Sequence, residues 1–361
     1  MKFDFLMYKL NNMSLRDKIG QMIMFDYRDS ILMNKELESI LTTYNPGGFI
    51  LFRSNIEDYK QTYQLLSDIK NATNTTGFIA VDQEGGRVQR LGARVGFPLY
   101  PPMAEVGKSD VKNTFELGKK MGEELNGIGV NMDMAPILDI YSNLENRVIG
   151  DRAFGTDADT VIEHAFAYAD GLIGTKIIPV GKHFPGHGDT FKDSHAELPV
   201  VEKSLEDLKK LELRPFKEAA ERNLPGLMAA HIAVPNITGD NTPTSLSSKM
   251  INGVLRKDLG YKGIIMSDSL KMKALTKFYT NQEIYLKTIE AGHDILLMPS
   301  SVKEAFDVLY REVNEGRISI DRINNSVYKI LSLKFDYGLL NEEYKGYLNS
   351  KKYIKIKRKN I

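Results

Sequence analysis

The sequence lacks cysteine altogether among its 361 residues. This absence excludes a disulfide framework, a thiolate zinc site and a thiol nucleophile. Long hydrophobic runs are also missing, because no apolar stretch approaches the roughly 18 residues of a membrane-spanning helix. The apolar start of the chain is interrupted by Lys2, Asp4 and Lys9, so it has no uninterrupted signal-peptide core. We therefore expect a soluble, cytoplasmic protein with no membrane partner.

The charge is not dominated by either sign. Lys and Arg number 48 and Asp and Glu 47, for a formal net charge of +1. Six of the positive charges, and no acid, lie in the last twelve residues, so the rest of the chain carries −5. A mildly acidic body argues against a nucleic-acid partner, which needs a basic face. We expect residues 341–361 to form a basic, solvated tail outside the main domain, and nothing indicates an obligate protein partner.

Eight short apolar runs recur along the chain, rich in Ile, Val, Met and Phe. Such continuous runs are typical of strands that are buried on both faces of a parallel sheet. The eight predicted strands lie within residues 20–27, 47–52, 77–82, 129–138, 175–184, 226–234, 263–268 and 293–299.

Segments with helical periodicity lie between these runs. They cover residues 35–43, 59–72, 111–128, 159–174, 205–223, 248–259, 282–292 and 302–315. Alternating strands and helices form either a doubly wound sheet or a closed barrel, and eight repeats favour the barrel. The sequence therefore predicts the α/β class: a single-domain (β/α)8 barrel of the TIM type over residues 1–340. A further amphipathic stretch, 320–337, is expected to pack on the barrel wall.

Polar residues follow several of the apolar runs. Asp82 ends the third run, Lys182 and His183 end the fifth, His231 lies in the sixth and Asp268 ends the seventh. In a (β/α) barrel the carboxyl ends of the strands meet at one mouth, where catalytic groups gather. Several charged groups at that mouth indicate a polar pocket rather than independent solvated strand ends.

The segment 182–195 carries the densest chemical signal. It holds three of the six histidines, and its two glycines and one proline indicate a shaped loop. Asp193 and His195 are two residues apart and can share one face of an extended segment. A carboxylate beside an imidazole orients the ring and favours its protonated form, which makes His195 a candidate general acid/base.

Two other chemistries compete for these residues. The histidines and aspartates of the loop could ligate a metal, but no H-E-x-x-H or H-x-H pattern accompanies them. The segment 82–87 has neither the glycine spacing nor the Lys-Ser/Thr of a phosphate-binding loop. We expect no metal, no nucleotide and no other cofactor.

Five motifs stand out along the chain: VDQEGGRVQR (81–90), DRAFG (151–155), KHFPGHGDT (182–190) with DSH (193–195), AHI (230–232) and SDSL-K-M (267–272). With these motifs the chain resembles glycoside hydrolase family 3, in its single-domain bacterial β-N-acetylglucosaminidase branch. The resemblance runs from about residue 20 to 338. The combination of KHFPGHGDT and DSH is the most specific of these motifs.

The resemblance implies a retaining exo-hydrolase that removes a terminal β-linked N-acetylglucosamine from a small carbohydrate substrate. It implies Asp268 as the nucleophile that forms a covalent glycosyl-enzyme, and His195 as the acid/base in a dyad with Asp193. It further implies that the sugar is bound by Asp82, Arg90, Arg152, Lys182 and His183. The expected substrates are fragments of the cell wall, N-acetylglucosaminyl-1,6-anhydro-muropeptides or related disaccharides.

Other functions remain open at this stage. A histidine acid/base carries no negative charge to repel phosphate, so the same residues could serve a phosphorylase. A β-glucosidase is a further alternative, although family members of that kind generally lack the 182–195 motif. Outside these classes, the chain could be a non-catalytic sugar sensor or a metal-dependent barrel hydrolase.

Overall fold

The computed structural model describes residues 1–190 and 197–359, with side chains through residue 350. Eight short strands form its core, and every residue of these strands is buried. Each lies inside one of the predicted apolar runs, so all eight strand predictions are confirmed. The strands are β1 (Ile23–Phe25), β2 (Gly48–Leu51), β3 (Phe78–Val81), β6 (Met132–Asp133), β7 (Ile178–Phe184), β8 (Gly226–Ala229), β9 (Ile264–Ser267) and β10 (Leu296–Leu297).

The strands close into a barrel. Their order is β10-β1-β2-β3-β6-β7-β8-β9, and every neighbouring pair is parallel. A parallel bridge between Met266 and Ile295 joins β9 to the segment that enters β10 and completes the ring. The predicted (β/α)8 barrel is therefore confirmed. In β7 the Lys182–His183 peptide bond is cis, and pairing with β8 is irregular between Lys182 and Phe184.

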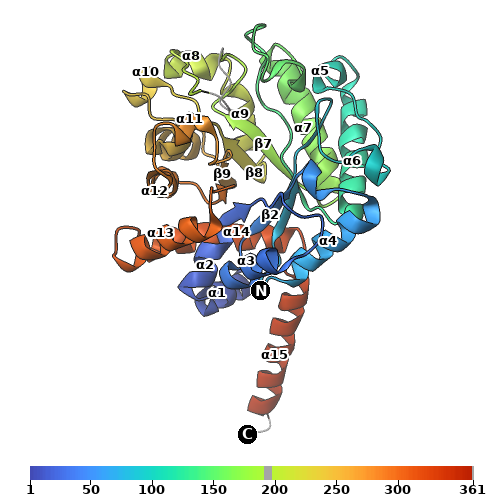
Figure 1. The fold of residues 1–361 in the computed structure, drawn as a ribbon, viewed down its shortest axis with the longest axis vertical. Coiled ribbons are helices and arrows are strands. Elements are labelled where there is room, and N and C mark those ends of the chain that lie inside the picture. Colours follow the sequence, from blue (N-terminus) through green and yellow to red (C-terminus); the bar gives the residue numbers. More distant parts are fainter. Residues whose placement is uncertain (191–196, 360–361) are drawn as a thin grey trace.

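Helices surround the strands as expected (Figure 1). They are α3 (Lys35–Tyr44), α4 (Tyr59–Asn71), α6 (Val111–Ile128), α7 (Ala158–Gly174), α8 (Leu205–Lys210), α9 (Arg214–Glu221), the π-helix η5 (Lys249–Asp258), α12 (Asn281–Ala291) and α13 (Val302–Asn314). The single helix predicted over residues 205–223 is wrong, because the segment forms α8 and α9. Pro215 lies in the first turn of α9, where its missing N–H is tolerated.

Both ends of the chain pack beside the barrel through α1 (Lys2–Asn12), α2 (Leu15–Gln21), α14 (Ile320–Asp336) and α15 (Asn341–Lys359). Phe5 of α1 lies 5.8 Å from Phe335, 5.1 Å from Tyr344 and 5.4 Å from Tyr347, measured between ring centroids. The expected solvated tail is thus a helix whose first turns join an aromatic cluster, while its far end extends away from the barrel (Figure 1). The domain boundary after residue 340 stays a prediction. None of the described helices is long and apolar enough to cross a membrane.

Short elements occupy the loops at the carboxyl ends of the strands. They include the hairpin β4 (Gln83–Gly85) and β5 (Val88–Gln89), α5 (Met103–Val106), η3 (Gly150–Arg152), α10 (Pro235–Thr238), η4 (Thr244–Leu246) and α11 (Lys273–Thr276). These loops carry side chains from distant parts of the sequence to one mouth of the barrel.

Candidate active site

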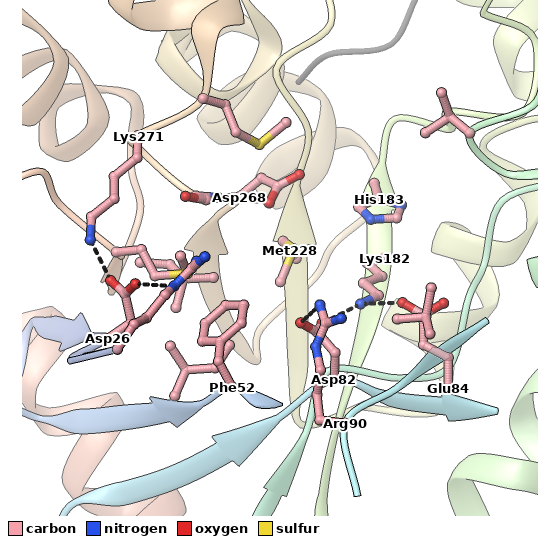
Figure 2. A pocket seen from close by; sticks show the side chains of 18 of the residues that line it. Asp26, Phe52, Asp82, Glu84, Arg90, Lys182, His183, Met228, Asp268 and Lys271 are labelled. Carbon is pink, nitrogen blue, oxygen red and sulfur yellow. Dashed lines mark hydrogen bonds and ion pairs between the residues drawn. The ribbon is translucent and has the colours of Figure 1, made fainter. Parts of the chain in front are cut away.

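A cavity of about 880 Å³ opens at the barrel mouth. Its size falls in the range typical of small-molecule sites. Six of the eight predicted site residues line it: Asp82, Arg90, Arg152, Lys182, His183 and Asp268. All of them except Arg152 are labelled in Figure 2. The other two, Asp193 and His195, lie outside the described residues.

One side of the cavity is a largely buried network of two carboxylates and three cations, which we call the charged network. Lys182 of β7 bridges both carboxylates, since its Nζ lies 2.9 Å from Asp82 Oδ1 and 2.6 Å from Glu84 Oε1. Arg152 donates to both oxygens of Glu84, at 2.8 and 2.9 Å. Arg90 donates to Asp82 Oδ2 at 3.0 Å. The network therefore ties β3, the β4–β5 hairpin, η3 and β7 together.

Mutual attraction keeps this network ionised. Burial by itself raises the pKa of Asp82, but Lys182 and Arg90 bring that pKa well below its usual value. The pKa of Glu84 is also lowered, because Arg152 and Lys182 outweigh its burial. Burial opposes the charge of Lys182, yet the two carboxylates raise its pKa above the ordinary value. All three groups are thus charged at neutral pH.

His183 is held from behind by a fully buried carboxylate, Asp139. The ring Nδ1 of His183 lies 2.7 Å from Asp139 Oδ2, and the backbone amides of His183 and His187 donate to Oδ1. Because a carboxylate only accepts, this contact places a proton on Nδ1 of His183. Burial, and next the charge of His183, lower the pKa of His187 to about 4, so His187 is neutral at pH 7.

Asp268 lies directly after β9. Its backbone N–H donates to Ala229 O at 2.9 Å, and its Oδ1 accepts from the amide of Ser269 at 2.7 Å. Within the described parts of the chain, Oδ2 has no hydrogen-bond donor. Burial raises the pKa of Asp268, but His183 and His231 more than offset this, so the pKa is lowered. Asp268 thus presents an ionised carboxylate to the cavity, as a nucleophile requires.

The opposite side of the cavity was not predicted from the sequence. Here Asp26, which follows β1, lies 2.8 Å from Arg28 Nε and 2.6 Å from Lys271 Nζ. The guanidinium of Arg28 lies 3.7 Å from the ring centroid of Phe52. We call Asp26, Arg28, Phe52 and Lys271 the Asp26 cluster. In Figure 2 Asp26 and Lys271 lie on the other side of Asp268 from the charged network, and Phe52 lies between the two groups, with its ring centroid 5.3 Å from the guanidinium of Arg90.

Some of the cavity residues that the sequence analysis did not predict do have a signal in the sequence. Asp26 ends an apolar run in the same way as Asp82 and Asp268, so the strand-end argument applies to it too. Glu84 lies within the family motif at 81–90, but no pattern in the sequence separates it from an ordinary loop carboxylate. Lys271 and Arg28 carry no such signal, because their contacts with Asp26 depend on the closing of the barrel.

The comparisons with known proteins identify the family. The model of the glycosyl hydrolase family 3 N-terminal domain matches residues 14–333. The chain belongs to glycosyl hydrolase family 3. This confirms the resemblance expected from the motifs and makes the chain a glycoside hydrolase.

Individual relatives agree with this placement. A beta-hexosaminidase of Nitrosomonas eutropha is 35% identical over 300 residues, which cover 80% of this chain and 85% of the relative. The beta-hexosaminidase LpqI of Mycobacterium tuberculosis is 32% identical over 331 residues, covering 89% and 83%. A family 3 beta-N-acetylglucosaminidase structure from a Paenibacillus species superposes with a TM-score of 0.87 at 36% identity. That alignment covers 91% of this chain but 63% of the Paenibacillus chain.

Proposed function

We propose that this glycoside hydrolase is a retaining exo-β-N-acetylglucosaminidase with Asp268 as its nucleophile. The observation that carries the proposal is the ionised Asp268 carboxylate, which faces the cavity between two polar walls. The beta-hexosaminidases and the beta-N-acetylglucosaminidase among the relatives support the choice of sugar.

The reaction runs in two displacement steps. Asp268 attacks the anomeric carbon and forms a C–O bond to it, while the bond to the leaving oxygen breaks and His195 gives that oxygen a proton. A water molecule then gives a proton to His195 and attacks the same carbon, which releases the sugar and restores the Asp268 carboxylate. Asp193 orients His195 and stabilises its protonated form. An imidazole takes the role of the second carboxylate of most retaining glycosidases.

The charged network provides the binding site for the N-acetylglucosamine. Asp82 accepts hydrogen bonds from sugar hydroxyls, whereas Arg90, Arg152 and Lys182 donate them. His183 offers the sugar its Nε2, because Asp139 holds Nδ1. The network's own ion pairs support this assignment, because they hold the donors and acceptors in place before a sugar arrives.

We further propose that the aglycone comes from fragments of the cell wall. Such muropeptides carry carboxylates, and the Asp26 cluster supports an acidic aglycone. Its two cations, Arg28 and Lys271, share the carboxylate of Asp26. With Asp29 and Lys273, which also line the cavity, these groups make three cations and two carboxylates, an excess of one positive charge.

Product analysis tests this function most simply. The protein is assayed on a chromogenic β-N-acetylglucosaminide and on the matching β-glucoside, in chelator, with and without phosphate. We expect release from the N-acetyl substrate alone, unaffected by chelator and phosphate. A sugar phosphate as product would replace hydrolysis by phosphorolysis, and silence on both substrates would refute the proposal.

A further inference from the structure

A second histidine lies behind the nucleophile and takes no part in the reaction above. His231 follows β8 and is fully buried. Its Nε2 lies 2.9 Å from the carbonyl oxygen of Ser269, and its Nδ1 lies 2.7 Å from Ser245 Oγ in η4. His231 thus contacts the residue next to Asp268 rather than the cavity.

The partners of the ring fix the position of one proton. A carbonyl oxygen only accepts, so Nε2 of His231 must carry a hydrogen and donate it to Ser269. The hydroxyl of Ser245 can either donate to Nδ1 or accept from it. The Nε2–H donor is therefore present whether the ring is neutral or protonated.

Ser269 connects this donor to the nucleophile. Its amide donates to Asp268 Oδ1 at 2.7 Å, while its carbonyl accepts from His231. The residues on either side are tied to neighbouring strand ends, with Asp268 N–H to Ala229 O and Leu270 N–H to Leu297 O, at 2.9 and 3.0 Å. The Ser269 carbonyl also accepts from the backbone amide of Met272 at 3.2 Å, so His231 adds a shorter side-chain bond to a turn that already has one backbone bond. The two bonds together orient the peptide that follows Ser269.

We propose that His231, held by Ser245, is a positioning residue that fixes the turn at Ser269 and so aims the Asp268 carboxylate at the anomeric carbon. The proposal rests on the proposed function, because it assigns His231 a part in nucleophilic attack. A displacement of about 1 Å at a reacting group is enough to cost roughly a hundredfold in rate. Loss of the tie should therefore slow attack without changing how the sugar is bound.

The chain offers a matched control. His164 of α7 is also buried, and its Nδ1 lies 2.7 Å from the hydroxyl of Thr114 on α6. Like His231 it has a hydroxyl partner and does not line the cavity, but its hydrogen bond is to a neighbouring helix and not to the turn after Asp268. A variant at His164 reports what the loss of a buried imidazole does to folding alone.

The experiment compares His231→Met, which removes the donor, with His231→Gln, whose amide keeps one, and with His164→Gln. We measure kcat and KM on an aryl β-N-acetylglucosaminide and the rate of covalent labelling by a fluorinated N-acetylglucosamine inactivator. Because attack is impaired, His231→Met should lower kcat and the labelling rate by about a hundredfold and leave KM within about threefold. His231→Gln should recover part of the loss, and His164→Gln should keep wild-type rates.

A second measurement, hydrogen exchange of the peptide spanning residues 265–275, needs no activity. The proposal expects faster exchange there in His231→Met than in His231→Gln, with no change in His164→Gln. Wild-type labelling rate and exchange in a folded His231→Met protein would overturn it. If the wild-type protein itself fails on N-acetylglucosaminides, the proposed function falls, while the exchange comparison still decides whether His231 holds the turn.

Discussion

The two sides of the cavity carry similar charges in different surroundings. The side chain of Lys182 in the charged network is 3% exposed, whereas those of Arg28 and Lys271 in the Asp26 cluster are 48% and 38% exposed. The Lys182 and Glu84 side chains were desolvated when the protein folded, while Arg90 stays 25% exposed, so the inner donors and acceptors of the network are fixed before the sugar binds. The Asp26 cluster stays partly hydrated and adjustable. Under the proposed function, we expect the first side to bind the N-acetylglucosamine and the second to contact the aglycone.

This difference in burial determines how much a substitution on each side should lower the stability of the protein. Breaking a buried ion pair costs about 3–5 kcal/mol, because it leaves a charge without a partner in a poorly polarisable environment. An exposed pair contributes about 0.2–1 kcal/mol and is screened by salt. Substitutions in the charged network should thus affect folding and activity together, whereas those in the Asp26 cluster should affect activity on particular substrates.

The largest effect is expected at Asp268, which lies between the two sides. Asp268→Ala removes the nucleophile and should lower kcat by about 10⁴-fold or more on every N-acetylglucosaminide. The thermal unfolding temperature should fall only slightly, because Asp268 is half-buried and loses one hydrogen bond, from the amide of Ser269, together with its attraction to His183 and His231. Turnover above 1% of wild type, roughly a hundredfold loss at most, would exclude Asp268 as nucleophile.

His195→Ala should depend on the leaving group. General acid catalysis contributes about 10²–10⁴-fold, and this contribution is needed most when the departing oxygen is a poor leaving group. The variant should therefore lose far more activity on natural disaccharides than on aryl substrates with acidic phenols. Equal losses on the two substrate classes would contradict the acid/base assignment.

Lys182→Met tests the buried side of the comparison. It keeps the side-chain length but leaves Asp82 and Glu84 without the cation that they share. We expect the free energy of unfolding to fall by about 3 kcal/mol or more, together with a loss of sugar binding. Urea denaturation and the KM for the chromogenic substrate measure the two effects. A variant as stable as wild type would show that the network is not held by Lys182.

Acid should destabilise the folded protein, because His187 must take up a proton in a buried position. Its pKa in the folded protein, about 4, lies below the ordinary value of 6.5, so the unfolded chain binds this proton first as the pH falls. The stabilisation is complete above pH 6.5 and is lost as the pH falls toward 4, by up to about 3 kcal/mol. Urea denaturation at pH 7 and pH 4.5 should show a smaller loss in His187→Gln than in wild type. An equal loss in both proteins would assign the acid sensitivity to other groups.

The smallest effect is expected in the Asp26 cluster. Lys271→Gln should lower kcat/KM only for substrates with an acidic aglycone, by about threefold to tenfold, and less at high salt. Lys257→Gln, at an exposed lysine away from the cavity, is the matched control. A similar loss on a neutral aryl substrate would mean that Lys271 does not read the charge of the aglycone.

Much of this molecule follows from local sequence patterns. The eight apolar runs located all eight strands, because strands buried on both faces leave a continuous apolar signature. Strand-end polar residues then located Asp82, Lys182, His183 and Asp268, since parallel strands bring their carboxyl ends to one mouth. The family motifs added Arg90 and Arg152, which also line the cavity.

The features that the sequence did not predict depend on contacts between distant segments. Asp139 holds His183 across 44 positions of the chain, and Lys271 reaches Asp26 across 245. Neither partner has a periodicity or spacing of its own that points to the other. The N-terminal helix α1 was missed for a related reason. Its apolar face packs against α14 and α15 from the other end of the chain.

The most direct test of the account is to identify the residue that the sugar modifies. The protein is incubated with a fluorinated N-acetylglucosamine inactivator, digested, and sequenced by mass spectrometry. The account predicts a single added sugar on the peptide that contains Asp268, with labelling abolished in Asp268→Ala. A sugar on another carboxylate, or catalytic turnover with no labelled peptide, would contradict the assignment of Asp268 as nucleophile.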